Sequence, residues 1–457
     1  MELRAYQKEC VFDTISSFEN VARKILLVLP TGAGKSACAS YIARQQTGYV
    51  WIIAHRQELL WQMSETLDRF SVPHGMVKAG QPFDPKHRVQ VASIQTLVRR
   101  YQKLPDPDML ICDEAHTTLS PTYQKVIDHY PSARILGVTA TPCRLNGQGL
   151  GEVYEHMIVG PNNKWLTENG FLCPAEYYAP PPMVDVSSLP IRAGDYAKEE
   201  TEQAMDKPTV TGDAVEHYRR ICDGVPMLVF CTSVAHARHV AEEYCAAGYR
   251  AASVDGTMSD EDRKDRIQGL GTGKWQIITS CDLIGEGLDV PIVGACQLLR
   301  PTASLRLHLQ QIGRILRPAD GKKVAFVLDH VNNVKKHGFA STIHPWSLKG
   351  TVKKKKNSEA SLRTCERCFL AHAPAPVCPN CGYEYPKQSK ALHRIETVDG
   401  KLVKIEETAE ERREQMKDAR SMGELIAFAK ARGYKNSFFW ARKVHDGRNY
   451  LGVMPKT

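Results

Sequence analysis

One short segment limits the fold of this chain more than any other. Residues 29–36 read Leu-Pro-Thr-Gly-Ala-Gly-Lys-Ser, and they join an apolar run, Ile25–Leu29, to a helical pattern that begins at Ser36. Glycines let such a loop turn sharply, so that its backbone N–H groups and the first turn of the helix point at one place. A strand, a glycine loop and a helix in this order predict a parallel sheet with an anion-binding loop at one strand end.

The same alternation of apolar runs and helical stretches continues along most of the chain, which indicates an α/β fold. The runs are nearly continuous, as expected for strands that are buried on both faces of a parallel sheet. The strand candidates of the first half are Ile25–Leu29, Tyr49–Ala54, Arg88–Ala92, Met109–Cys112 and Ile135–Thr139. Those of the second half are Met227–Cys231, Arg250–Val254, Trp275–Thr279, Ala295–Leu298 and Val324–Leu328.

A chain of 457 residues is also too long for one hydrophobic core. A Pro-rich stretch, Ala179–Met183, interrupts the strand pattern, and the composition changes again after Trp346. We predict a first α/β domain, a connector, a second α/β domain, a basic linker, a cysteine-rich module and a basic helical C-terminal module. Their expected bounds are 1–170, 171–204, 205–345, 346–360, 361–385 and 386–457.

The net charge of +9 is unevenly placed along the chain. Residues 341–457 hold 23 Lys and Arg against 13 Asp and Glu, whereas residues 1–340 hold 37 against 38. A localised basic excess is typical of a protein that binds an anionic polymer, and it is equally typical of a solvated surface. Charge alone leaves both interpretations open.

The chain begins without an apolar signal core, and no run approaches the length that spans a bilayer. We therefore expect a cytoplasmic protein with no membrane partner. The 14 cysteines are mostly scattered through a long chain, which argues against a disulfide scaffold.

The glycine loop contains the candidates for a nucleotide phosphate site. The ammonium of Lys35 would reach the β- and γ-phosphates, and the hydroxyl of Ser36 would ligate Mg²⁺. Leu29 stands where the general pattern has its first glycine. The candidate phosphate-binding residues are Thr31, Gly32, Ala33, Gly34, Lys35 and Ser36.

Two acids, Asp113 and Glu114, follow the predicted strand Met109–Cys112. The carboxyl ends of parallel strands face the ligand crevice, so both carboxylates are expected near the glycine loop. Asp113 suits Mg²⁺ binding, and Glu114 suits the base that orients an attacking water.

A second basic motif lies far along the chain, in the second predicted domain. Gln310, Arg314 and Arg317 follow an i, i+4, i+7 spacing, which places them on one face of a helix. An arginine from a second domain can stabilise charge on a transferring γ-phosphate and can make hydrolysis depend on domain closure.

These motifs occur in one fixed order along the chain, namely Leu29–Ser36, Asp113–His116, Thr139–Thr141, Gly285–Pro291 and Gln310–Arg317. As a set they resemble the motifs of superfamily 2 helicases and translocases of the DEAH type, over about residues 1–340. The resemblance implies two tandem RecA-like domains that bind ATP and Mg²⁺ between them. It also implies an ATPase motor that closes and opens around ATP and thereby moves along a nucleic-acid strand.

The resemblance assigns further nucleotide contacts to named positions. Leu3–Gln7 matches the adenine-reading motif, which implies that Gln7 contacts adenine and that Arg4 lies beside the base. Gly287 and Asp289 match motif V of the family at the ATP site.

Contacts to the nucleic-acid backbone are implied in the same way. His55 and Arg56 match motif Ia, and Thr232 matches motif IV. The family also uses the sequence Thr139–Thr141 to couple the ATP site to the strand. Such contacts are expected to be independent of base sequence.

The resemblance favours DNA over RNA as the partner. The opening motif and the Thr-Ala-Thr sequence are similar to those of restriction-enzyme motor subunits, excision-repair helicases and phage branched-DNA helicases. It therefore implies a phage or bacterial DNA helicase or translocase, with replication, recombination or restriction proteins as further partners. An RNA helicase, a motor subunit of a restriction or nuclease complex and a non-catalytic nucleic-acid clamp are the alternatives, and the intact Lys35, Glu114 and Arg314 argue against the clamp.

Four cysteines are clustered, and their spacing differs from that of the others. They form two Cys-x-x-Cys pairs, Cys365 with Cys368 and Cys378 with Cys381. Four thiolates at such spacing can close a tetrahedral Zn²⁺ site, which predicts a structural zinc ribbon.

The C-terminal segment Tyr434–Lys443 mixes Phe438, Phe439 and Trp440 with basic residues. Aromatic rings beside basic side chains can stack on bases. Aromatic residues in a helical pattern are more often buried, so we favour the core of a small helical module.

Overall fold

The computed structural model describes residues 2–179, 189–192, 194–205, 208–281, 290–350, 362–385, 396–398, 401–403, 422, 425, 426, 429 and 436–450. The chain divides into two compact units, Met1–Glu384 and Tyr385–Thr457, which are described separately.

The first sheet of the larger unit has seven parallel strands in the order β3-β4-β2-β5-β6-β1-β7. The register pairs Val28 with Thr139 and Asp113 with Val138, so the carboxyl ends of β1, β5 and β6 lie side by side. The strands are β1 (Lys24–Val28), β2 (Val50–Ala54), β3 (His74–Val77), β4 (Val89–Ser93), β5 (Met109–Asp113), β6 (Arg134–Thr139) and β7 (His156–Val159).

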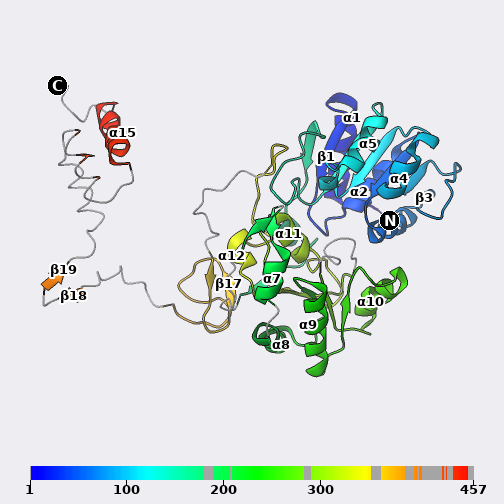
Figure 1. Cartoon of the computed structure of the whole chain (residues 1–457). Helices are drawn as coiled ribbons and strands as arrows, with labels where there is room; N and C mark the ends of the chain where they lie inside the picture. The colour runs from blue at the N-terminus through cyan, green and yellow to red at the C-terminus, as the bar shows by residue number, and fades with distance from the viewer. Residues whose placement is uncertain are drawn as a thin grey trace. The chain divides into compact units, whose positions relative to one another are not determined.

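Helices cover both faces of this sheet (Figure 1). Alternate residues of β1 belong to two different hydrophobic clusters. Ile25 and Leu27 belong to the first cluster, and Leu26 and Val28 belong to the second. The first cluster includes α1, α2 and α3, and the second includes α4 and α5. The helical elements are α1 (Ala5–Asn20), α2 (Lys35–Gln45), α3 (Gln57–Arg69), α4 (Ile94–Arg100), η1 (Tyr101–Lys103), η2 (Ala115–Thr117), α5 (Pro121–His129) and α6 (Asn163–Glu168).

The second sheet has eight strands in the order β12-β13-β11-β14-β15-β8-β17-β16. The six strands from β12 to β8 are parallel, and β17 and β16 extend this sheet in antiparallel pairing. The strands are β8 (Ala175–Tyr178), β11 (Met227–Phe230), β12 (Ala251–Val254), β13 (Ile277–Ser280), β14 (Ala295–Leu298), β15 (Ala325–Asp329), β16 (Arg363–Thr364) and β17 (Leu370–His372).

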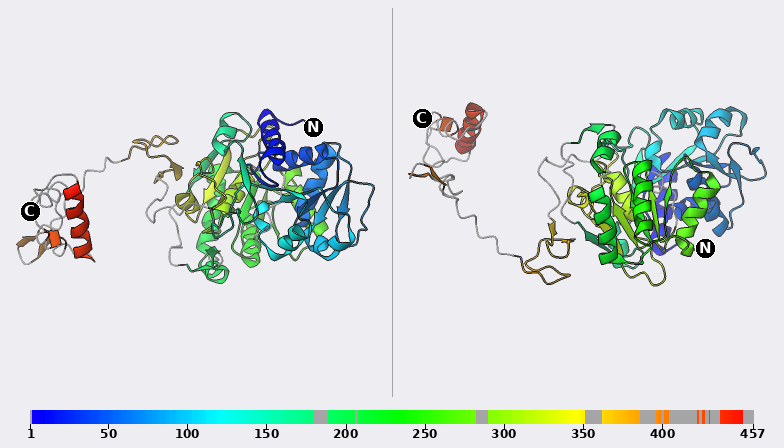
Figure 2. Two further views of the ribbon diagram at one scale, coloured as in Figure 1. Left: turned by 90° about the horizontal axis from the view of Figure 1, so that it is seen from above. Right: turned by 60° about the horizontal axis from the view of Figure 1, so that its bottom comes forward.

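Helices pack beside the second sheet (green in Figure 2), and the same region contains a short hairpin. They are β9 (Ile191–Arg192), β10 (Asp195–Tyr196), α7 (Lys198–Met205), α8 (Pro208–Cys222), α9 (Val234–Ala246), α10 (Asp260–Thr272), α11 (Leu305–Gly313) and α12 (Asn333–His337). Every strand that the sequence predicted is present, with bounds that agree to within two residues.

Three segments contact the α/β domains across the domain bounds that we predicted. β8 lies in the expected connector, yet it pairs with β15, and its Tyr177 and Tyr178 are buried. β17 of the cysteine-rich module pairs with β8. The start of the expected linker returns to the first domain, where the N–H of Gly151 donates to the carbonyl of Leu348. The domain bounds themselves stay a prediction.

The smaller unit contains β18 (Glu396–Val398) paired with β19 (Lys401–Val403), and α15 (Ser437–Tyr450). Leu425 and Ala441 form its buried cluster, and Trp440 packs against them, whereas Phe438 is 57% exposed. The side chain of Phe439 lies outside the described residues.

Among the described residues, we find no helix with both the length and the apolar character needed to cross a bilayer.

Candidate functional site

The glycine loop has the geometry of an anion-binding turn. Gly32 and Gly34 have φ angles of 86° and 87°, which only glycine adopts readily. Gly34 is the N-cap of α2, and no side chain caps this helix end. The first N–H groups of α2 and its dipole are therefore available to a phosphate.

A cavity of about 270 Å³ opens at this loop and is lined by both α/β domains. It joins most of the residues that the sequence predicted for the nucleotide site. These are Arg4, Gln7, Thr31, Gly32, Gly34, Lys35, Ser36, Asp113, Glu114, Arg314 and Arg317. Ala33 is buried beside them.

The two acids are held in place by several contacts. Asp113 and Glu114 are only 6% and 4% exposed, and Oδ1 of Asp113 accepts the N–H of Glu114 at 3.0 Å. Glu114 has a φ of 51°, a left-handed conformation that is uncommon for a residue with a side chain and that occurs at functional sites. Its Oε2 lies 3.3 Å from Nδ1 of His116 and accepts Nε2 of Gln310 at 3.4 Å. Glu114 is thus oriented by groups from both domains.

Lys35 lines the cavity together with both acids and interacts with their charges. Removal of its ammonium from water lowers the pKa of Lys35, while the carboxylates of Glu114 and Asp113 oppose this shift. The nearby Arg314 and Arg317 lower the pKa of Lys35 further. An anion in the cavity would stabilise the charged form of this group.

The end of α11 is pressed against the glycine loop. A Cβ atom on Gly313 would lie 2.5 Å from Cβ of Thr31, so only glycine permits this approach. Arg314 follows at the C-cap and is 4% exposed. Because α11 ends at Gly313, Arg317 lies beyond the helix, and the prediction of one helical face for Gln310, Arg314 and Arg317 is wrong. The close approach brings Arg314 and Arg317 from the second domain to the phosphate end of the cavity.

Gln7 has a fixed orientation beside the glycine loop. Its Oε1 accepts the N–H of Arg4 at 2.9 Å, and its Nε2 donates to the carbonyl of Ala33 at 2.9 Å. The guanidinium of Arg4 lies over the ring of Phe171, 5.1 Å from the ring centroid. An amide and an arginine held in this way suit the recognition of a planar base.

A second cavity, of about 420 Å³, lies at the same carboxyl edge of the first sheet, and we call it the basic cavity. Three arginines and two histidines line it, and no Asp or Glu stands among the described residues of its lining. These five side chains are His55, Arg56, His116, Arg144 and Arg306. Gln95, Thr117, Ser120, Thr122 and Asn146 add hydrogen-bonding groups. Cationic and amide donors without acids favour an anionic ligand.

One loop separates the two cavities. Glu114 lines the nucleotide cavity and His116 lines the basic cavity, and their side chains are in contact. α11 also reaches both cavities. Its Arg306 lines the basic cavity, and Gln310, one helical turn later, contacts Glu114 of the nucleotide cavity. A displacement of either element therefore affects both cavities.

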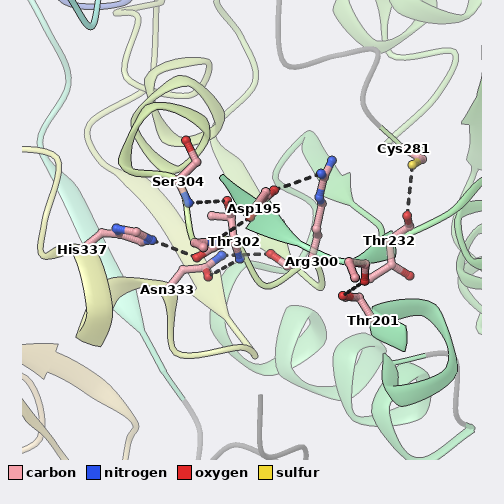
Figure 3. A network of polar contacts seen from close by, with 11 residues as sticks. Asp195, Thr201, Thr232, Cys281, Arg300, Thr302, Ser304, Asn333 and His337 are labelled. Atoms are coloured by element: carbon pink, nitrogen blue, oxygen red, sulfur yellow. Dashed lines mark hydrogen bonds and ion pairs between the residues drawn. The ribbon is translucent and has the colours of Figure 1, made fainter. Parts of the chain in front are cut away.

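The start of α11 is anchored by the β9–β10 hairpin. The buried carboxylate of Asp195 accepts the N–H of Ala303 at 2.6 Å, the hydroxyl of Thr302 at 2.9 Å and Nη2 of Arg300 at 3.2 Å (Figure 3). The adjacent Gly194 lies against the backbone of Asn146, where a Cβ atom would be 2.5 Å from the amide nitrogen. The hairpin thus connects a loop of the basic cavity to α11.

Other predicted contacts lie elsewhere in the structure. Thr232 is buried, its hydroxyl lies 2.8 Å from Nδ1 of His236, and its carbonyl accepts Sγ of Cys281 at 3.2 Å (Figure 3). Gly287 and Asp289 lie outside the described residues.

Sequence reasoning missed several residues that line the cavities. Arg144 follows the Thr-Ala-Thr motif by three residues, and Arg306 precedes Gln310 by four, so both stood next to recognised motifs. Gln62, Thr66 and Arg69 of α3 also line the nucleotide cavity. Only Arg144 and Arg306 could have been found from the sequence, because they lie next to recognised motifs.

The four clustered cysteines converge as predicted. Their Sγ atoms all lie within 4.8 Å of one another, with 3.6 Å between Cys365 and Cys381 and 3.7 Å between Cys368 and Cys378. A tetrahedral Zn²⁺ bound at about 2.3 Å would separate its sulfur ligands by about 3.8 Å. The donor set and its spacing fit this metal.

Two family models match the chain. Residues 1–144 match "Type III restriction enzyme, res subunit", and residues 213–319 match "Helicase conserved C-terminal domain". The matches cover the glycine loop, the acid pair, the Thr-Ala-Thr motif and the segment with Gln310, Arg314 and Arg317.

Two curated relatives align with most of the chain. A 51.5 kDa protein of Lactococcus phage (isolate 7-9) is 32% identical over 384 residues, which are 82% of this chain and 81% of the relative. A DNA 3′–5′ translocase of Sulfurisphaera tokodaii is 23% identical over 359 residues, which are 70% of this chain and 80% of the relative.

A solved structure shares the fold. The ATP-dependent Type ISP restriction-modification enzyme LlaBIII bound to DNA aligns with a TM-score of 0.55 and 17% sequence identity. The alignment covers 72% of this chain and 28% of that enzyme.

Proposed function

Because the chain belongs to the ATP-hydrolysing superfamily 2 helicases and translocases, with tandem RecA-like domains, we propose that it moves along or remodels duplex or branched DNA. The observation that supports this proposal is the pair of cavities at one sheet edge. One of them suits a nucleotide with its metal, and the other suits a phosphate backbone. The loop with Glu114 and His116 touches both, so hydrolysis in one is coupled to strand binding in the other.

The family implies ATP and Mg²⁺ as cofactors, and the nucleotide cavity has suitable groups for both. The metal would neutralise charge on the phosphates, with Ser36 and Asp113 as its protein ligands. Lys35 and the N–H groups of residues 31–36 bind the phosphates. Glu114 accepts a proton from the attacking water and holds that water in line, with Gln310 fixing its carboxylate.

Domain closure controls the reaction through the arginines. Arg314 and Arg317 stabilise the charge that develops on the γ-phosphate, and both come from the second domain. Gly287 and Asp289 of motif V are assigned to the same site. At the base, Gln7 selects adenine and Arg4 lies against its ring.

The DNA strand lies in the basic cavity. His55, Arg56 and Arg144 from the first domain and Arg306 from the second contact its phosphates. Thr232 serves as a further backbone contact in the second domain. Because the groups of this cavity come from two domains, opening and closing of the nucleotide cleft changes the distance between the two sets of phosphate contacts.

The preference for DNA rests on the relatives. The translocase of Sulfurisphaera tokodaii is named for DNA, and the restriction-modification enzyme was solved with DNA bound. The alignment covers only 28% of that restriction-modification enzyme, and we assign a nuclease or restriction subunit as a partner of the motor. Replication or recombination proteins are the other partners we assign.

The cysteine cluster binds one structural Zn²⁺ through Cys365, Cys368, Cys378 and Cys381. All four positions of a tetrahedral site are filled by the protein, which is typical of a structural rather than a catalytic metal. Metal binding at this place supports the β16–β17 hairpin at the edge of the second sheet.

Steady-state ATPase rates with Mg²⁺ test the proposal. Single-stranded DNA, duplex DNA, forked DNA and single-stranded RNA are compared with no nucleic acid. We expect strong stimulation by at least one DNA and little by RNA, and the most effective DNA identifies the preferred substrate. Stimulation by RNA alone would assign the chain to RNA remodelling.

A further inference from the structure

One lysine binds two loops of the second domain through three hydrogen bonds. Lys322 lies in the turn before β15, and its Nζ donates to the carbonyls of Arg317 at 2.7 Å, Val293 at 2.6 Å and Pro291 at 3.1 Å. An ammonium has three donors, so each of its N–H bonds has a backbone acceptor here.

Two of these acceptors belong to the wall of the nucleotide cavity. Arg317 and Pro291 both line that cavity, although they lie on different loops. Lys322 is itself outside its lining and contacts the loops from behind.

The connector between the domains joins the same loop. The N–H of Cys173 donates to the carbonyl of Leu316 at 2.7 Å, and Sγ of Cys173 lies 3.8 Å from the carbonyl of Lys322. The loop that carries Arg317 is therefore held by Lys322 on one side and by the connector on the other.

We propose that Lys322 is a positioning residue for ATP hydrolysis, which holds Arg317 and Pro291 together at the γ-phosphate end of the nucleotide cavity. The proposal rests on the role of Arg317 in the proposed function. The three bonds require the protonated amine, because a neutral amine has only two N–H donors and would release one of the three carbonyls.

The environment of Lys322 lowers the pH at which its amine loses the third proton to a value near neutrality. Burial lowers the pKa of Lys322 to about 8, with Arg317 adding to the shift and Cys173 and Cys296 opposing it. Among the described residues, these are the titratable groups that act on the ammonium. The ammonium is present below pH 8 and is lost as the pH rises through this value.

Stability depends on pH in the opposite direction. The unfolded chain keeps this lysine protonated up to its ordinary pKa of about 10.4, so it binds more protons than the folded chain between about pH 8 and 10.4. This group alone therefore makes the fold more stable as the pH rises in that window. If ATPase activity falls with rising pH while the melting temperature stays constant, the loss of activity therefore reports the positioning role of Lys322 and not general unfolding.

The test compares basal ATPase, without nucleic acid, in the wild type, Lys322→Met, Lys322→Arg and the adjacent exposed control Lys323→Met, from pH 6.5 to 9.5. We expect Lys322→Met to lower kcat on the order of 10- to 100-fold at pH 7 with a small change in KM for ATP, because a small displacement of a catalytic group has costs of this size. Arg keeps its charge over the whole range, so Lys322→Arg should lose the decline above pH 8 that the wild type shows.

The control Lys323→Met should keep both the wild-type rate and the wild-type pH profile. A folded Lys322→Met protein with wild-type kcat would overturn the proposal. If Lys322→Met does not fold, identical alkaline declines in the wild type and Lys322→Arg would overturn it as well, because the decline would then belong to another group. Basal ATPase is independent of DNA, so a failure of the DNA assignment leaves this test intact.

Discussion

The nucleotide cavity and the basic cavity lie at the same edge of one sheet and differ in the charges of the side chains that line them. The nucleotide cavity contains Lys35 and arginines together with the buried acids Asp113 and Glu114. The basic cavity contains arginines and histidines, and none of the described residues in its lining is an acid. Mixed charges suit a metal–phosphate ligand that reacts, whereas cations alone suit a phosphate backbone that is bound and released.

The largest effect is expected from Arg314, which belongs to the nucleotide cavity alone. Arg314→Ala should lower kcat for ATP about 10³–10⁵-fold, because an arginine at the γ-phosphate contributes a factor of this size. DNA affinity without nucleotide should stay within about twofold of the wild type, as measured by fluorescence anisotropy. An equal loss of DNA affinity would mean that the two cavities are not separate sites.

A substitution in the basic cavity should have the opposite effect, with weaker DNA binding and unchanged basal ATPase. Arg144→Ala should weaken DNA binding about 10- to 100-fold, because charge-assisted hydrogen bonds contribute about 1.5–3 kcal/mol. The slope of log affinity against log salt should fall by about 1, since one phosphate contact is lost. Basal ATPase should be unchanged, and the same result is expected for Arg306→Ala. A drop in basal kcat for Arg144→Ala would contradict the division of roles.

A third change should affect both cavities at once. Asp195 anchors the start of α11, and α11 carries Arg306 at one cavity and Gln310 at the other. Asp195→Asn removes the ion pair with Arg300 and one strong acceptor, so basal and DNA-stimulated ATPase should both fall about two- to tenfold. Loss of stimulation with an unchanged basal rate would show that the anchor serves the basic cavity alone.

The smallest catalytic effect is expected from the cysteine cluster, which lines neither cavity. Metal analysis should find about one Zn²⁺ per chain. Cys381→Ser should release the metal and lower the melting temperature by several degrees, because metal binding contributes folding energy at the edge of the second sheet. The kcat at 20 °C should stay within about twofold. Absence of metal in the wild-type protein would refute the zinc assignment.

The sequence predicted the nucleotide cavity better than the basic cavity, and the reason is physical. Lys35 and Ser36 are fixed by a local turn, and Asp113 and Glu114 follow directly from the end of a buried strand. Motif order then identified the superfamily and the ATPase activity, and both are confirmed by the family matches and the relative named as a translocase.

The basic cavity depends on contacts between distant parts of the chain. His55 and Arg56 were predicted by resemblance, whereas Arg144 and Arg306 meet them only because α11 packs across the domain boundary. The same holds for Lys322, whose three acceptors lie on loops that the sequence does not connect.

Strand pairing between distant parts of the chain was also not predicted from the sequence. Every apolar run longer than three residues that we assigned to a strand is a strand. The pairing of β17 with β8 was not predicted, because two short strands almost 200 residues apart carry no local signal of each other.

The most direct test of the account is reciprocal coupling between the two cavities. The affinity of Glu114→Gln protein for fluorescent single-stranded DNA is measured with and without ATP and Mg²⁺, so that nucleotide is bound without turnover. The account predicts a change in DNA affinity of about 5- to 150-fold, with an equal change in ATP affinity when DNA is present. The same DNA affinity in both conditions would contradict the claim that one loop and one helix couple the two sites.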